Sequence, residues 1–160
     1  MEKINSYDYK ATDIANWFLC HIDRDAGDSI THLKLQKLLY YAQAWCIVLS
    51  GKSLFEDDFE AWSHGPVLPG IYHDYKHFGF EALPSCDCIN NIEEEVENIL
   101  DEVRRVYGEK SAKYLEELTH HEAPWIEARN GLPLEVRCSN IISKENMLRF
   151  YSEMLQENEG

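Results

Sequence analysis

The segment from Thr31 to Ser50 constrains the fold of this chain more than any other part of it. Apolar residues recur there every three and four positions, and aromatic and aliphatic residues widen that stripe on both sides. Gly51 follows this segment, where a left-handed C-terminal cap is expected. A helix that is apolar nearly all round has to be covered by several neighbours. We therefore predict one long central helix with the rest of the chain packed around it.

The other periodic segments predict about five more helices. Their expected ranges are 12–23, 68–77, 91–108, 111–121 and from 143 to near the end of the chain. In this prediction Thr12, Asn91, Ser111 and Ser143 cap helices. Pro124 interrupts the helical pattern after residue 121, and the stretch from Trp125 to Arg129 has room for a further turn. The stretch from 131 to 141 is expected to be a loop with at most one short strand.

The stretch around residues 59–67 is expected to contain a strand and a sharp break. Phe59 to Trp62 has the alternation of a short strand, whereas the Gly65–Pro66 pair is expected to end any regular element. No repeat or linker divides the chain. The predicted fold class is therefore mainly α. We expect a single compact domain over residues 1–160, with a core from about 12 to 155, about six helices and room for a small two-stranded β element.

The charge of the chain restricts its partners. There are 29 Asp and Glu residues against 15 Lys and Arg residues, which gives a formal net charge of -14. Nucleic-acid binding relies on basic residues that displace counterions from phosphates, so we expect no direct contact with nucleic acid. Either the acidic surface attracts a basic protein, or it serves only solubility. The acidic run over residues 93–102 allows the same two interpretations, a solvated helix face or a docking surface.

Cysteine usage and hydropathy predict a cytoplasmic protein. The five cysteines are odd in number, no apolar leader is found near the start, and we expect all the thiols to be reduced. The longest apolar stretch is far shorter than a membrane span, so no membrane partner is expected.

Three groupings of metal-ligating side chains are each incomplete. They are His73 with His77, Cys86 with Cys88, and His120-His121-Glu122. None has a matching second pair, and the last lacks the second histidine that a zinc hydrolase helix carries four residues after the first. Phosphate-binding loops and nucleophile motifs are also missing from the sequence. We therefore predict no catalytic residue, no metal site and no cofactor.

Three motifs in a fixed order resemble a known family. They are LKLQKLLYYAQAW from Leu33, LFEDDFEAWSHGPVLPGIYHDYKHFG from Leu54, and ELTHHEAPW from Glu117. Together they resemble the Panacea-domain proteins, the SocA-like antitoxins that are often found in prophages and are also labelled GepA-like. The resemblance covers roughly residues 12–155.

The resemblance implies a mostly helical antitoxin that neutralises a cognate toxin by binding it. The family's toxins belong to many classes, so neither the toxin nor the oligomeric state follows. The founding member implies an alternative, an adaptor that delivers its toxin to a ClpXP-type protease. A third alternative is an enzyme that acts on the toxin or its product. Some relatives carry an added DNA-binding domain, and we expect this chain to lack one.

The resemblance also supplies the candidate partner-binding residues. They are Lys37, Tyr40, Tyr41, Glu60, Trp62, His64, Gly65, Pro66 and Tyr72. Two interpretations of the hairpin motif stay open at this point. The Gly-Pro pair and the aromatic rings can form a corner of the fold, or they can form a surface that contacts the toxin. His64 is the member that a turn does not require.

Overall fold

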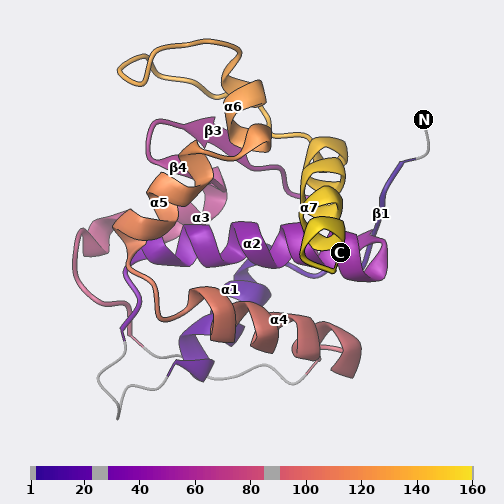
Figure 1. Ribbon diagram of the computed structural model, residues 1–160. Coiled ribbons are helices and arrows are strands. Elements are labelled where there is room, and N and C mark those ends of the chain that lie inside the picture. Colours follow the sequence, from indigo (N-terminus) through magenta and orange to yellow (C-terminus); the bar gives the residue numbers. More distant parts are fainter. Residues whose placement is uncertain (1–2, 23–28, 85–90, 160) are drawn as a thin grey trace.

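The computed structural model describes residues 3–22, 29–84 and 91–159. In these ranges the chain forms seven α-helices, one 3-10 helix and two small two-stranded sheets, with α2 running through the middle (Figure 1). The helices are α1 (Ala11–His21), α2 (His32–Ser50), α3 (Pro69–Tyr75), η1 (Lys76–Phe78), α4 (Glu94–Tyr107), α5 (Ala112–His120), α6 (Ala123–Arg129) and α7 (Lys144–Glu159). The mainly α fold class is confirmed, with seven α-helices in place of the expected six.

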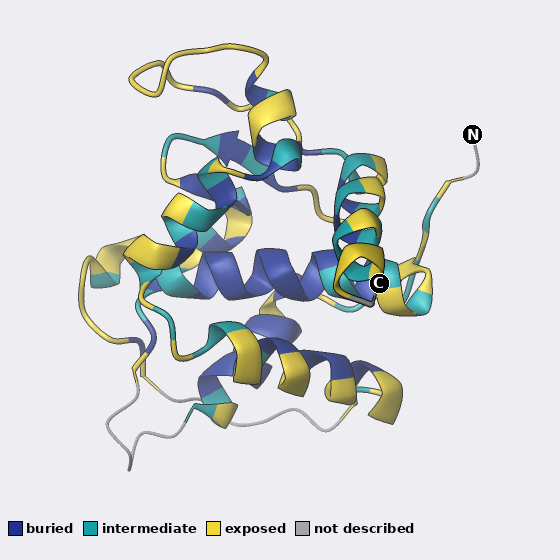
Figure 2. Cartoon of the chain, in the orientation of Figure 1, coloured by how far each residue is buried: buried dark blue, intermediate teal, exposed yellow. Residues whose placement is uncertain are grey.

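The central helix is the one that the sequence predicted. The Thr31 hydroxyl accepts a hydrogen bond from the Lys34 N–H, and Gly51 ends the helix at φ 78° with its N–H donating to the Ile47 carbonyl. Helices α1, α4, α5 and α7 all pack against α2. As a result α2 is buried along most of its length, whereas α4 buries only its inner side (Figure 2).

The strands differ from the prediction in number and position. Strand β1 (Asn5–Ser6) pairs in parallel with β2 (Lys52–Ser53), and β3 (Glu60–Trp62) pairs antiparallel with β4 (Gly65–Val67). The expectation that the Gly65–Pro66 pair ends regular structure is therefore wrong. Pro66 is accommodated because β4 lies at the edge of its sheet, where a missing N–H leaves no gap in the ladder.

Several predicted helix starts are also corrected. Thr12 lies inside the first turn of α1, which begins at Ala11, and α4 begins at Glu94 rather than at Asn91. The expected break near Pro124 falls between α5 and α6, and Pro124 itself lies in the first turn of α6, where its missing N–H is not needed. The predicted caps at the starts of α5 and α7 are confirmed, since the hydroxyls of Ser111 and Ser143 accept backbone hydrogen bonds there.

Two buried glutamines of α2 hold non-helical segments against it. The Gln43 amide donates to the Phe55 carbonyl at 3.0 Å and accepts from the Leu54 N–H at 2.6 Å. Gln36 makes the same pair of bonds with Leu68, at 3.1 and 2.8 Å. Each side chain thus satisfies the backbone of its segment as a neighbouring strand would.

A buried carboxyl joins three more parts of the fold. One oxygen of Glu122 accepts hydrogen bonds from the hydroxyls of Tyr41 on α2 (2.7 Å) and Tyr151 on α7 (2.9 Å). Burial raises the pKa of Glu122, although both hydroxyls stabilise its ionised form. The Tyr41 ring also stacks on Tyr107 of α4, with ring centroids 4.1 Å apart. This cluster therefore links α2, α4, α7 and the start of α6.

The described cysteines and histidines only partly follow the prediction. Cys46 and Cys138 are free and buried, but Cys20 is disulfide-bonded, so the expectation that every thiol is reduced is wrong there. His73 and His77 are exposed, and within the described ranges no three His, Cys, Asp or Glu side chains are grouped to hold a metal ion. Cys86 and Cys88 lie outside the described residues.

Within the described residues, none of the helices has the length and apolar character needed to cross a membrane.

Gln43→Leu tests the role of the buried glutamines. Leucine fills similar space but leaves the Leu54 N–H and the Phe55 carbonyl without partners, so we expect the free energy of unfolding to fall by about 2–4 kcal/mol. Urea unfolding measures the change, with Gln156→Leu at an exposed position of α7 as the control. Equal stability of the two variants would show that these hydrogen bonds do not hold the segment.

Candidate functional site

The β3–β4 hairpin lies at one end of the molecule, beside α5, α6 and the loop of residues 130–143 (Figure 1). The outer edge of β3 is covered by that loop. The Ala61 N–H donates to the Asn140 carbonyl at 2.9 Å, and the Ile142 N–H donates to the Phe59 carbonyl at 2.8 Å. The hairpin is therefore held from both sides, by the loop at β3 and by α2 at β4.

Gly65 is required by its surroundings. Its φ of 99° is a conformation that side-chain-bearing residues rarely adopt. A Cβ placed there would lie 2.7 Å from Cε of Lys37 and 2.9 Å from Oγ1 of Thr119. At this position the motif forms a corner of the fold.

Lys37 lies beneath that corner. Its side chain is almost fully buried, and Nζ donates to the Pro66 carbonyl at 3.3 Å. Burial lowers the pKa of Lys37 to about 8, against the opposing effect of the nearby Glu116 carboxylate. Lys37 therefore supports the hairpin from within the molecule.

His64 lies on the outside of the same turn. Its Nδ1 is 2.7 Å from a carboxylate oxygen of Glu116, whose other oxygen accepts from Lys113 at 3.0 Å. Burial disfavours the ionised form of Glu116, but these two hydrogen bonds outweigh it, and the pKa of the carboxyl lies below its usual value. The His64 side chain is 73 % exposed and that of Glu116 only 13 %. An exposed imidazole is thus held in a fixed orientation.

Aromatic side chains fix the rest of the hairpin. The Trp62 indole donates to Glu60 at 2.9 Å and meets the Tyr72 ring edge to face at 4.9 Å. Its backbone carbonyl accepts from the Trp125 indole at 2.8 Å, and the His120 ring stacks on Trp125. Glu60, Trp62 and Tyr72 are half-buried and keep part of their surface open to a partner.

The structure divides the nine predicted partner-binding residues into two groups. Lys37, Tyr40, Tyr41, Gly65 and Pro66 are buried, while Glu60, Trp62 and Tyr72 are half-buried and His64 is exposed. Seven of them gather around the hairpin. The exceptions are Tyr40 and Tyr41, which lie in the tyrosine cluster with Tyr151. The buried residues lie beneath the surface and can influence a partner only through the residues that cover them.

A buried arginine holds the neighbouring loop in place. One Arg129 nitrogen donates to the Ala61 carbonyl of β3 at 2.9 Å, and another donates to the carbonyls of Pro133 (2.7 Å) and Val136 (2.8 Å). The guanidinium also lies over the Trp125 ring, 5.2 Å from its centroid. These contacts fix the course of the loop relative to the hairpin.

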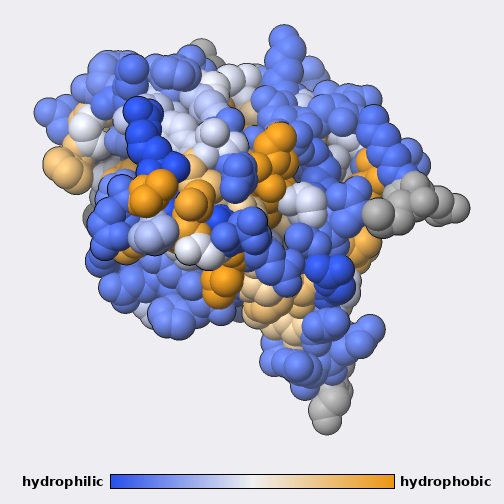
Figure 3. All heavy atoms as spheres, turned by 90° about the horizontal axis from the view of Figure 1, so that it is seen from above, coloured by the Kyte–Doolittle hydropathy of each residue, from blue (hydrophilic) through white to orange (hydrophobic). Residues whose placement is uncertain are grey.

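This loop and its flanks carry an exposed group of apolar side chains. We call it the loop patch, and it consists of Ile126, Leu132, Leu134, Val136 and Ile141. Each of the five is at least 40 % exposed. Figure 3, which looks onto this end of the molecule, shows hydrophobic areas gathered among hydrophilic ones.

A cavity of about 410 Å³ lies between the hairpin and one part of the loop. It is lined by Glu60, Trp62, Ser63, His64, Arg137, Cys138 and Ser139. Polar groups in the cavity next to exposed apolar groups on the loop match the composition of a protein-binding surface, with an apolar centre and a polar rim.

The residues that build this surface were not predicted from the sequence. Arg129 has no local signal, because a buried arginine in a helix looks like a solvated one. Glu116 likewise occupies an ordinary helix position. Leu132, Leu134 and Val136 alternate along the stretch predicted to be a loop, and that alternation was the one available signal.

Comparison with known proteins assigns the chain to a family. The family described as "Antitoxin SocA-like, Panacea domain" matches residues 35–126, which is more than half of the chain. The chain belongs to the SocA-like Panacea-domain family. The matched Panacea region runs from α2 to the middle of α6, so it includes the hairpin and Glu116 but, apart from Ile126, not the loop patch.

One curated relative of this Panacea-domain chain matches it over part of both sequences. "Antitoxin SocA" of Caulobacter vibrioides (strain NA1000 / CB15N) is 29 % identical over 115 residues. The match covers 64 % of this chain and 61 % of the relative, so the chain spans less than two thirds of the relative's length. The comparison with solved structures gave no match.

Gly65→Ala tests the corner. The added Cβ meets Lys37 and Thr119 at an unfavourable φ, so we expect the free energy of unfolding to fall by more than about 1 kcal/mol. Gly70→Ala is the matched control, because a Cβ there meets no atom within 4 Å and lies in helix α3. That control should be unchanged or more stable by about 0.5–1 kcal/mol. Thermal unfolding of both variants checks the difference.

Lys37→Met tests the buried ammonium group. The folded pKa is about 8 and the ordinary value is 10.5, so between these values the unfolded chain binds more protons than the folded one. Stability should therefore rise with pH across this window, by on the order of 3 kcal/mol, and Lys37→Met should lack that rise. Urea unfolding at a series of pH values from 7 to 10 measures it. Parallel pH profiles for the two proteins would contradict a lowered pKa.

Proposed function

We propose that this protein is an antitoxin that neutralises a cognate toxin by direct binding, with the loop patch as the centre of the contact. The observation that carries the proposal is the exposed apolar loop that Arg129 fixes beside the exposed His64. Family membership and the name of the Caulobacter relative support the antitoxin role.

The geometry favours binding because the surface is held in place before a partner arrives. Arg129 joins the loop to β3, so the loop backbone does not have to be ordered on contact. A surface that loses little conformational freedom retains more of its gross interaction energy as affinity. A few apolar side chains at the centre of an interface commonly supply most of that energy.

The predicted hairpin residues take two roles in this proposal. Glu60, Trp62, His64 and Tyr72 lie at the rim of the contact, and the buried Gly65 supports them together with Lys37 and Pro66. The net charge of -14 favours a protein partner over nucleic acid. The proposed encounter takes place in the cytoplasm.

The experiment starts from the product of the neighbouring gene, tested as the toxin. Co-expression of this chain at a limiting level should restore growth, and the purified proteins should form a complex near one to one. An enzyme would protect at a small fraction of that ratio, which separates the two functions.

Variants then locate the contact. The double substitution Leu134→Asp with Val136→Asp places charge in the patch at exposed positions, so folding should persist while toxin binding weakens by at least about tenfold. His64→Ala should weaken binding by about 1–2 kcal/mol at an unchanged melting temperature. Tyr114→Asp, at an exposed aromatic outside the patch, is the control. Full neutralisation by the double variant would rule out the loop patch as the contact.

A further inference from the structure

A second apolar surface lies where α4 and the C-terminal half of α7 both pack against α2 (Figure 1). Between them is a groove of about 380 Å³, which we call the α4–α7 groove. It is lined by Trp45, Leu49, Ile99, Glu102, Val103, Val106, Tyr107, Met154, Leu155 and Asn158. Eight of these ten residues are apolar or aromatic, so the groove suits large apolar side chains.

The floor of the groove is rigid and its walls are accessible. The Trp45 indole donates to the Tyr107 hydroxyl at 2.9 Å, and the Tyr107 ring stacks on the buried Tyr41. Leu49 and Val106 are 50 % and 44 % exposed. They are two of the four large exposed hydrophobic residues that lie outside the loop patch in the described part of the chain. The groove is therefore preformed and open to solvent.

The two wall helices carry a strong excess of negative charge. Helices α4 and α7 together contain nine acidic and four basic residues. All four basic side chains are already ion-paired with an acidic residue of the same molecule. The pairs are Arg104 with Asp101, Arg105 with Glu102, Lys144 with Asp58 and Arg149 with Glu127.

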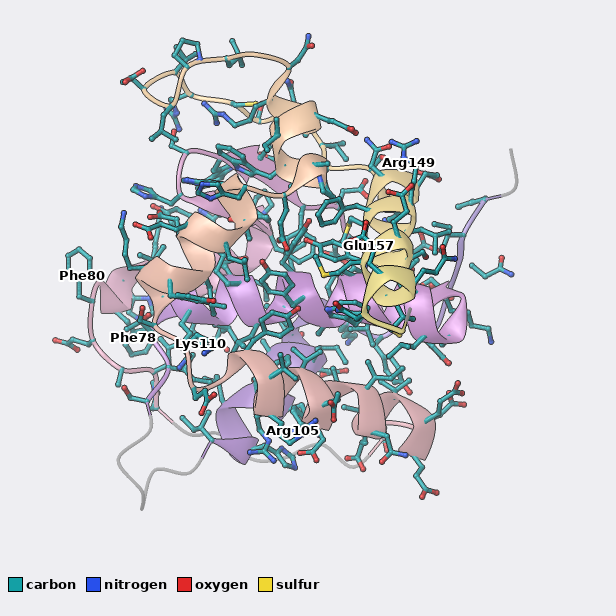
Figure 4. The ribbon with its side chains drawn as sticks, viewed as in Figure 1. Phe78, Phe80, Arg105, Lys110, Arg149 and Glu157 are labelled. Carbon is teal, nitrogen blue, oxygen red and sulfur yellow. The ribbon has the colours of Figure 1, made fainter. Side chains whose placement is uncertain are left out.

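Several acidic side chains of these helices form no ion pair with any residue that the structure describes. Within the residues that the structure describes, no ion pair involves Glu94, Glu97, Glu153 or Glu157, and all four are exposed. Figure 4 shows Arg105 on the side of α4 away from α2, and it shows Arg149 and Glu157 on α7. The exposed outer faces of the walls are thus left negatively charged around an apolar groove.

We propose that the α4–α7 groove binds a basic amphipathic helix of the toxin. Its apolar side chains enter the groove, and its lysines or arginines face the acidic walls. This inference rests on the proposed antitoxin function and adds a contact separate from the loop patch. An amphipathic helix that inserts apolar anchors into a groove is a common mode of protein recognition.

The negative charge of α4 and α7 favours a basic helix over a second copy of the chain or an anionic membrane. A second copy of the chain would bring another net charge of -14 to the same surface, and an anionic membrane would be repelled as well. A basic segment gains attraction on approach, because the exposed glutamates of α4 and α7 named above form no ion pair among the described residues.

A peptide probe tests the groove without the toxin. The probe is a labelled helical peptide of about 14 residues with leucines spaced three and four apart and lysines on both flanks. A matched peptide carries glutamates in place of the lysines. Fluorescence anisotropy with the full chain should show binding of the lysine peptide only, weakened by salt. Equal binding of both peptides, or binding of neither, would overturn the inference.

Variants of this chain place the probe in the groove. Leu49→Glu and Val106→Glu alter exposed positions, so both proteins should keep the melting temperature of the wild type. Each should bind the lysine peptide at least about tenfold more weakly. Tyr114→Glu, which changes the net charge equally at an exposed site outside the groove, should bind as the wild type does. A loss of affinity as large in Tyr114→Glu would show that only the overall charge matters, and would overturn the inference.

The toxin itself separates this inference from the proposed function. Support comes if the wild type neutralises the toxin and Val106→Glu binds it at least about tenfold more weakly. If Val106→Glu binds the toxin as tightly as the wild type, the groove inference fails and the proposed function stands. If the wild type neither binds nor neutralises the toxin, both fail. A wild-type dimer that Val106→Glu dissociates in sedimentation would assign the groove to a second copy and overturn the inference.

Discussion

Buried polar side chains on α2 are the constraint on which the rest of this structure depends. Gln43 and Gln36 supply the hydrogen bonds that the segments at Leu54 and Leu68 lack within the sheets, and Tyr41 reaches the carboxyl of Glu122. Apolar packing supplies most of the burial energy, but it has no direction. Hydrogen bonds to buried backbone groups do have a direction, and an unmade one is costly. They therefore decide which segment lies on which face of the central helix.

The same constraint joins two motifs that are distant in the sequence of this chain. The Gln36–Lys37 pair of α2 meets the end of the hairpin, where Lys37 donates to the Pro66 carbonyl and passes close to Gly65. A side chain at Gly65 would collide with that lysine. The motifs thus form two halves of one contact. The hairpin motif forms a corner of the fold and also carries an exposed side chain. The buried Gly65 fixes the turn that exposes His64 beside Glu116.

The two exposed apolar surfaces depend on that framework in different ways. The loop patch is held indirectly, through Arg129, which connects the loop to β3 and lies against Trp125. The α4–α7 groove is held directly by α2, whose Trp45 forms part of its floor. Both surfaces are therefore rigid on account of contacts made inside the molecule. A rigid apolar surface on a strongly acidic protein fits a role in binding other proteins.

The sequence by itself determined the central helix, its C-terminal cap and most of the other helices, because periodicity and capping are local properties of a few neighbouring residues. Through a resemblance it also named nine candidate residues, of which seven lie around the hairpin, whereas Tyr40 and Tyr41 do not. It could not show that Pro66 joins an edge strand or that Tyr40 is buried. Nor could it show that Arg129 reaches Ala61, 68 residues earlier in the chain. Only the tertiary structure decided these points, since a partner so distant is fixed by how the helices pack and leaves no pattern in the local sequence.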